Sequence, residues 1–222
     1  MATLYTHQDT NVRKTWILMA GFLVMVMFLG WAVSWYFNSS FILYIAVGFA
    51  LVMNIVSYWY SDKIVLKMSG AKPINRGEHR ELWNIVENLS ITAGLPMPRV
   101  YIVDDKAPNA FATGRDAEHG VVAVTTGLLG MLEKNELEGV IAHELSHIGN
   151  RDILVSTIVV VLVGFITLLS DFFLRATFWG GGRRNGGDGR VQLAMMIIGI
   201  VLAILAPIVA IDIQLAISRK RE

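Results

Sequence analysis

The sequence contains no cysteine, and only 17% of its 222 residues are charged. The absence of cysteine excludes a disulfide scaffold, a thiolate metal site and a cysteine nucleophile. Ordinary soluble domains carry about 25% charged residues, so the low charge argues against a simple water-soluble globule. Nineteen basic and eighteen acidic side chains leave a net charge of +1. Because binding by phosphate neutralisation needs a strong positive charge, we expect no nucleic-acid partner.

Hydrophobic residues make up 54% of the chain, and four long apolar runs hold most of the excess. The runs are Trp16 to Phe37, Phe41 to Tyr60, Ile153 to Ser170 with a continuation to Leu174, and Val191 to Ile217. About 20 apolar residues span the hydrocarbon core of a bilayer as a helix, so each run is long enough. The first two are joined only by residues 38–40, which predicts a tight hairpin. The sequence therefore indicates an integral membrane protein with four helices in two hairpins.

A cleavable signal peptide is the alternative interpretation of the first run, since Arg13 and Lys14 precede it. The apolar part of a signal peptide is about 7–15 residues long, however. The run from Trp16 to Phe37 is longer and ends in aromatic residues of the kind found at headgroup level. We therefore interpret it as a retained membrane anchor.

The distribution of lysine and arginine predicts the orientation of the first hairpin. Basic residues flank both of its outer ends, whereas the connection at residues 38–40 is uncharged; they are Arg13, Lys14, Lys63, Lys67, Lys72 and Arg76. Both ends should therefore face the cytoplasm. The loop from Arg175 to Arg190 also carries four arginines, although by crossing parity it should lie outside. Either the second hairpin does not fully span, or this Gly-rich loop breaks the rule.

The stretch from Ser61 to Asp152 holds most of the charge and predicts a small α+β domain. The expected elements are a helix over Glu78–Ile91, strands over Arg99–Val103 and Gly120–Thr125, a short edge strand over Asn109–Gly114, and a helix capped by Asn135 with Glu138. We expect four segments: residues 1–60 as the first hairpin, 61–152 as this domain, 153–217 as the second hairpin and 218–222 as a final segment.

The capped helix carries His143-Glu144-Leu145-Ser146-His147. Two histidines four residues apart on a helix lie on one face, so both imidazoles can reach one Zn²⁺. Glu144 lies beside that face and can take a proton from a zinc-bound water, the role of a general base. The alternative is a polar cluster at the end of a helix that Gly149 terminates. The other histidines, His7, His79 and His119, lack metal-ligand spacing and are expected to be solvated.

A catalytic zinc site usually has three protein ligands. A third ligand must lie on the same membrane face as His147, which requires an even number of crossings after it. Glu222 follows the fourth apolar run and meets this condition. Asp152 is too close along the helix, and Asp171 and Asp212 lie at the wrong depth. We therefore expect Glu222 to be the third metal ligand.

The HExxH helix, the hydrophobic hairpin after it and the ending Ser218-Arg219-Lys220-Arg221-Glu222 together resemble the HtpX family of membrane zinc metalloproteases. These are gluzincins related to the CAAX prenyl proteases. The segment Asn109-Ala110-Phe111-Ala112-Thr113-Gly114 and the turn Thr125–Leu129 match the same family. The resemblance covers essentially the whole chain. It implies a zincin-like cytoplasmic domain between the hairpins, one Zn²⁺ per chain, and Glu222 as the third ligand.

The resemblance further implies an endopeptidase of the bacterial or archaeal cytoplasmic (inner) membrane, with its active site facing the cytoplasm. Its partners would be the lipid bilayer and misfolded or damaged membrane proteins or unfolded polypeptides, which it would remove in protein quality control. Residues 109–114 would align the substrate peptide. In the family, the ligand glutamate opens a Glu-x-x-x-Asp helix, whereas this sequence stops at Glu222. Since such orienting groups are worth about 10–100-fold in metal affinity, we expect a truncated chain with weak zinc binding and little proteolysis.

Two functions from other classes are a membrane transporter and a non-catalytic zinc-binding scaffold. Transport predicts ionisable groups along a path inside the bilayer. Only Asp171 and Asp212 lie within the apolar runs, both near helix ends, and no repeated broken-helix segments are present. The sequence therefore favours the peptidase.

Overall fold

The computed structural model describes residues 4–180, 193–204 and 207. The chain divides into two compact units, Met1–Ile158 and Val159–Glu222. Three helical segments, Asp9–Tyr36, Ser40–Met68 and Asp152–Arg175, are long and apolar enough to cross a membrane. The described part of the chain is thus mostly helical, with three candidate spans and a small sheet. The fourth apolar run is described only in part, where Leu193–Ile204 forms a shorter apolar helix.

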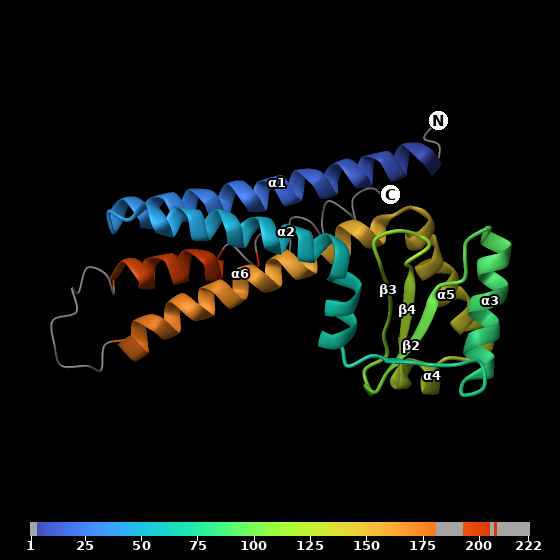
Figure 1. The fold of residues 1–222 in the computed structure, drawn as a ribbon. Coiled ribbons are helices and arrows are strands. Elements are labelled where there is room, and N and C mark those ends of the chain that lie inside the picture. The colour runs from blue at the N-terminus through green and yellow to red at the C-terminus, as the bar shows by residue number, and fades with distance from the viewer. Residues whose placement is uncertain (1–3, 181–192, 205–206, 208–222) are drawn as a thin grey trace. The chain divides into compact units, whose positions relative to one another are not determined.

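The first unit begins with a helical hairpin. Helix α1 (Leu4–Tyr36) and helix α2 (Ser40–Met68) lie side by side (Figure 1). Gly30 permits their close approach, because a Cβ at this position would collide with the Cβ of Ala46. Asn54 Nδ2 donates to the carbonyl oxygen of Met19 at 3.2 Å, which ties the two helices together. Because α1 ends at Tyr36 and α2 begins at Ser40, the predicted tight hairpin is confirmed, with its connection at residues 37–39 instead of 38–40.

The first unit also contains a four-stranded sheet with the order β1-β2-β4-β3. Its strands are β1 (Lys72–Pro73), β2 (Arg99–Val103), β3 (Ala110–Thr113) and β4 (Val121–Thr125). Strands β2 and β4 are parallel, with Arg99 opposite Val121, whereas β3 runs antiparallel to β4 with Ala110 opposite Val124. The prediction of an edge strand within residues 109–114 is confirmed, since β3 lies at one edge. Sequence analysis missed the two-residue strand β1.

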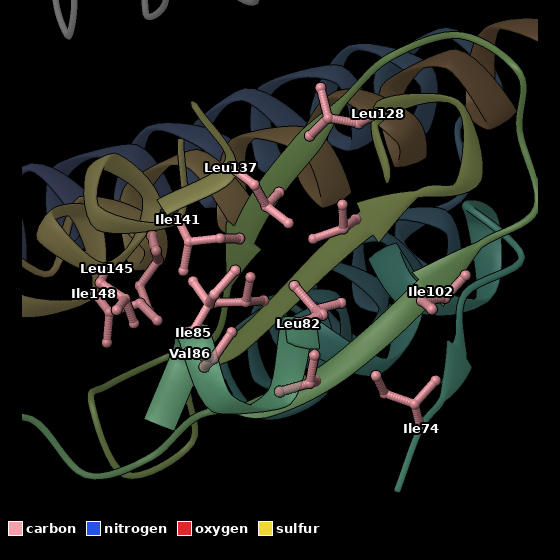
Figure 2. Close-up of a cluster of buried hydrophobic side chains, with 14 residues drawn as sticks. Ile74, Leu82, Ile85, Val86, Ile102, Leu128, Leu137, Ile141, Leu145 and Ile148 are labelled. Carbon is pink, nitrogen blue, oxygen red and sulfur yellow. The ribbon is translucent and has the colours of Figure 1, made fainter. Parts of the chain in front are cut away.

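Three helices complete the small domain: α3 (Arg80–Ala93), α4 (Thr126–Met131) and α5 (Lys134–Gly149). They enclose the main hydrophobic core with the sheet (Figure 2). Helix α3 contributes Leu82, Ile85 and Val86, which recur in the sequence at the spacing of one helical face. Helix α5 contributes a row of fully buried side chains, among them Ile141 and Leu145. Burial of this row fixes which face of α5 points away from the core.

The predicted start of α5 was wrong. The helix begins at Lys134, with Glu133 as N-cap, and the Glu133 N–H donates to Glu136 Oε2 at 2.9 Å. The N-cap is therefore two residues before the predicted Asn135. Leu132 and Leu137 both join the core, and apolar residues in these positions before and after a cap set where a helix starts.

The second unit contains most of helix α6 (Asp152–Gly180) and the apolar helix Leu193–Ile204. Ser170 Oγ donates to the carbonyl oxygen of Gly199 at 2.7 Å, which joins the two helices. The arginine-rich loop predicted over residues 175–190 lies mostly outside the described residues. The orientation of this hairpin therefore stays a prediction.

Candidate metal centre

His143 and His147 project from the face of α5 that is turned away from the core. The buried side chains of Ile141, Leu145 and Ile148 anchor the opposite face. The Nε2 atoms of the two histidines lie 3.3 Å apart, and their ring planes are nearly perpendicular, at 87°. The helix therefore presents two imidazole nitrogens toward one point, as the four-residue spacing predicted.

The separation of these nitrogens fits a tetrahedral zinc ion. Two nitrogens each bound at about 2.0–2.1 Å with a tetrahedral angle would lie about 3.3–3.4 Å apart. The observed 3.3 Å agrees with this separation. His147 Nδ1 lies 3.2 Å from Asp152 Oδ2, so its N–H can donate to the carboxylate and leave Nε2 with a lone pair for a metal. The donor atoms present therefore suit zinc.

A third protein ligand is not among the residues that the structure describes. Within residues 4–180, 193–204 and 207, no group of three histidine or carboxylate side chains is gathered as a metal site. Glu222, the predicted third ligand, lies outside the described residues.

Glu144 lies between the two histidines in sequence and contacts the edge of the sheet. The Ala112 N–H of strand β3 donates to Glu144 Oε2 at 2.9 Å. Because alternate residues of a strand face opposite ways in the hydrogen-bonding direction, Ala110 shares this outward orientation with Ala112. The carboxylate of Glu144 is thus placed beside the edge strand of the sheet, and extended peptides can add to such an edge as a further strand.

The other residues of the predicted substrate segment hold the edge strand in place. Asn109 exchanges hydrogen bonds with Thr125, through Asn109 N to Thr125 Oγ1 and Thr125 N to Asn109 O, both at 2.9 Å. Thr113 Oγ1 lies 2.9 Å from Thr157 Oγ1 in a buried contact. Gly114 adopts φ +139, where a Cβ would approach the His119 carbonyl to 2.6 Å. Phe111 packs on a second apolar cluster.

His119 lies outside the centre and belongs to a separate polar network. Its Nδ1 lies 2.6 Å from Asp116 Oδ1, and its Nε2 lies 2.8 Å from a guanidinium nitrogen of Arg115. Partial burial tends to raise the pKa of Asp116, but hydrogen bonds from His119 and Arg115 outweigh it and lower the pKa. The Arg115 guanidinium also lies 4.5 Å from the centre of the Trp59 ring, so this loop contacts helix α2.

Two residues near the centre were missed or set aside by sequence analysis. Asp152 was considered only as a direct ligand, although in the structure its carboxylate contacts His147 Nδ1, the ring nitrogen that does not face His143. Asn11, in helix α1, donates to Asp152 Oδ1. Local patterns give no signal for a contact between residues 141 positions apart. The helix break before Asp152 is the only local feature that could have drawn attention to it.

Comparison with known proteins gives a consistent result. The model of peptidase family M48 matches residues 77–222, which include strands β2, β3 and β4 and helix α5. A protein named "Protease HtpX homolog" from Caldanaerobacter subterraneus subsp. tengcongensis is 45% identical over 99% of this chain and 75% of its own length. Proteins of the same name from Thermoanaerobacter pseudethanolicus and Tropheryma whipplei are each 46% identical over 99% of this chain. The matched regions span 75% and 74% of those two proteins, respectively.

Proposed function

The chain belongs to peptidase family M48 and is a membrane-associated metalloprotease of the HtpX type, and from this premise we propose that His143, Glu144 and His147 form its catalytic centre. The family implies a metal cofactor and polypeptide substrates. The observation that carries the proposal is the 3.3 Å separation of the two Nε2 atoms beside a glutamate that is bonded to the edge strand of the sheet.

The metal is one zinc ion per chain, held by His143 and His147. Imidazole and carboxylate donors without thiolates suit zinc, and Glu222 is the carboxylate that we assign as third ligand from its place in the sequence. A zinc ion held there would supply Lewis acidity, which polarises a peptide carbonyl and makes water more acidic. The protein's own contribution is to place the nitrogens, the base and the substrate around that position.

Glu144 is the general base. Its carboxylate can accept the proton of the attacking water and then give it to the leaving amine. The Ala112 N–H holds one carboxylate oxygen at the sheet edge, which keeps Glu144 next to the place where a peptide would lie. An extended substrate would pair with the outward backbone groups of β3, which gives affinity with little preference for particular side chains.

The substrates that we propose are misfolded or damaged membrane proteins. Only residues 148–151 separate His147 from the apolar helix α6, so the centre is close to the membrane surface. The basic residues around the first hairpin favour the cytoplasmic side of a bacterial or archaeal inner membrane. Four helices in two hairpins around a zincin-like domain of residues 61–152 complete the proposed arrangement. Protein quality control is the role that fits a low side-chain preference.

Metal removal tests the proposed function directly. Treatment of the purified full-length protein, by which we mean the chain extended past Glu222 to the length of the relatives in the comparison, with 1,10-phenanthroline should abolish cleavage of casein. The histidines alone cannot activate water. One equivalent of Zn²⁺ should restore the activity, whereas Mg²⁺ should not, since magnesium prefers an all-oxygen shell. Cleavage that is unaffected by complete metal removal would contradict the proposal.

The substitution Ala110→Pro tests substrate alignment on β3. Proline removes one outward backbone N–H while the ladder to β4 is preserved, because that ladder is made by the alternate residues. We expect a several-fold rise in KM and an unchanged zinc content. Ala110→Ser is the matched control, since it keeps the N–H and a small side chain. If both variants have the kinetics of the parent protein, the substrate does not align there.

A further inference from the structure

We propose that Asn11, in the first helix, is a positioning residue for His147 and acts on it through Asp152. The inference rests on the proposed role of His147 as a metal ligand. It is carried by a continuous chain of hydrogen bonds from Asn11 to Asp152 and from Asp152 to His147.

This series of hydrogen bonds depends on a break between helices α5 and α6. Helix α5 ends at Gly149 and α6 begins at Asp152, and Arg151 between them adopts a left-handed conformation with φ +56. In an uninterrupted α-helix, residues five apart lie about 140° apart around the axis, so Asp152 could not face His147. The break turns the Asp152 carboxylate back toward the imidazole, with 3.2 Å between Oδ2 and Nδ1.

Asn11 bridges the two sides of this break. Its Nδ2 donates to the carbonyl oxygen of Asn150 at 3.1 Å and to Asp152 Oδ1 at 2.5 Å. Asn11 is 8% exposed, and Thr15, whose Oγ1 donates to the Asn11 carbonyl at 3.0 Å, is fully buried. Both N–H groups of one buried carboxamide therefore fix the helix break and one oxygen of the carboxylate.

The second oxygen of the Asp152 carboxylate, Oδ2, connects Asn11 to the metal centre through His147. A carboxylate that accepts the Nδ1–H of a ligand histidine fixes its ring orientation and tautomer, and loss of such a partner costs about 10–100-fold in metal affinity. Asn11 holds the Asp152 carboxylate in place, so loss of the Asn11 side chain should lower metal affinity in a similar way. Asn11 comes two residues before Arg13, just ahead of the first apolar run. The first membrane helix is thus a part of the metal centre's support.

The test compares Asn11→Leu with Asn54→Leu in the full-length protein. Leucine has the size of asparagine but no donor. Asn54 is also a buried asparagine of the hairpin, but its Nδ2 bonds to Met19. We expect Asn11→Leu to weaken zinc binding about 10-fold or more and to change the visible spectrum of the Co²⁺-substituted protein. Asn54→Leu should change neither, even if it lowers the unfolding temperature.

A double-variant cycle separates positioning from general stability. If Asn11 acts through Asp152, Asn11→Leu should add little to the zinc affinity already lost in Asp152→Ala, because coupled residues are not additive. Should Asn11→Leu fail to fold, Asn11→Ser takes its place, since serine is too short to bridge the break. The inference is overturned if the Asn11 variant binds zinc within about twofold of the parent. It is also overturned if the losses of affinity in the two single variants multiply fully in the double variant.

The two proposals can fail separately. If His147→Ala binds zinc as the parent does, the assignment of the metal ligands is wrong. If His147→Ala loses zinc but the Asn11 variants do not, the metal centre stands and only the role of Asn11 is rejected.

Discussion

Replacing Glu144 with glutamine should lower the rate of peptide cleavage by about 10²–10⁴-fold while zinc still binds. The amide has nearly the same shape as the carboxylate and can still accept the Ala112 N–H through its oxygen. It cannot take a proton from water, however, so the step that needs a base is lost. The loss should appear in kcat, with KM little changed.

Glu138→Gln is the matched control for this prediction. Glu138 is on the same helix, but its exposed carboxylate pairs with Lys134 at 3.8 Å, away from the histidines. An exposed pair of this kind is worth at most about 1 kcal/mol, so activity should be unchanged. A Glu144→Gln protein with the parent's kcat would show that Glu144 is not the base.

The elements that the sequence predicted are those that local patterns control. The helical face of Leu82, Ile85 and Val86 is in the core, and the strand predicted over Arg99–Val103 has the same bounds in the structure. The HExxH spacing also placed both imidazoles on one face of α5. These features depend on residue periodicity within one or two turns, which is why they could be read without a structure.

Features that depend on distant contacts could not be read in this way. The start of α5 is set by Leu132 and Leu137 packing into a core that the whole domain makes, which overrides a capping pattern at Asn135. The contact of Asn11 with Asp152 joins helices α1 and α6, which are separated in the sequence by α2 and the small domain. The contact of Ala112 with Glu144 likewise depends on how the sheet edge meets α5. Such contacts require the tertiary fold.

Replacing either histidine with alanine should remove zinc from the protein at ordinary metal concentrations. Structural zinc sites are worth about 10–16 kcal/mol over four ligands, which suggests about 10²–10³-fold in affinity for each ligand lost. His143→Ala and His147→Ala should therefore both lose metal and proteolysis together. His119→Ala is the control, since His119 is exposed and bonded to Asp116 and Arg115 outside the centre.

The most direct measurement is zinc K-edge X-ray absorption on the full-length protein and these variants. The parent protein should show two imidazole nitrogens at about 2.0–2.1 Å, with oxygen atoms completing the zinc shell. His147→Ala, loaded with excess zinc, should show one imidazole, and His119→Ala should still show two. An all-oxygen shell in the parent, or two imidazoles in His147→Ala, would contradict a metal centre built on His143 and His147.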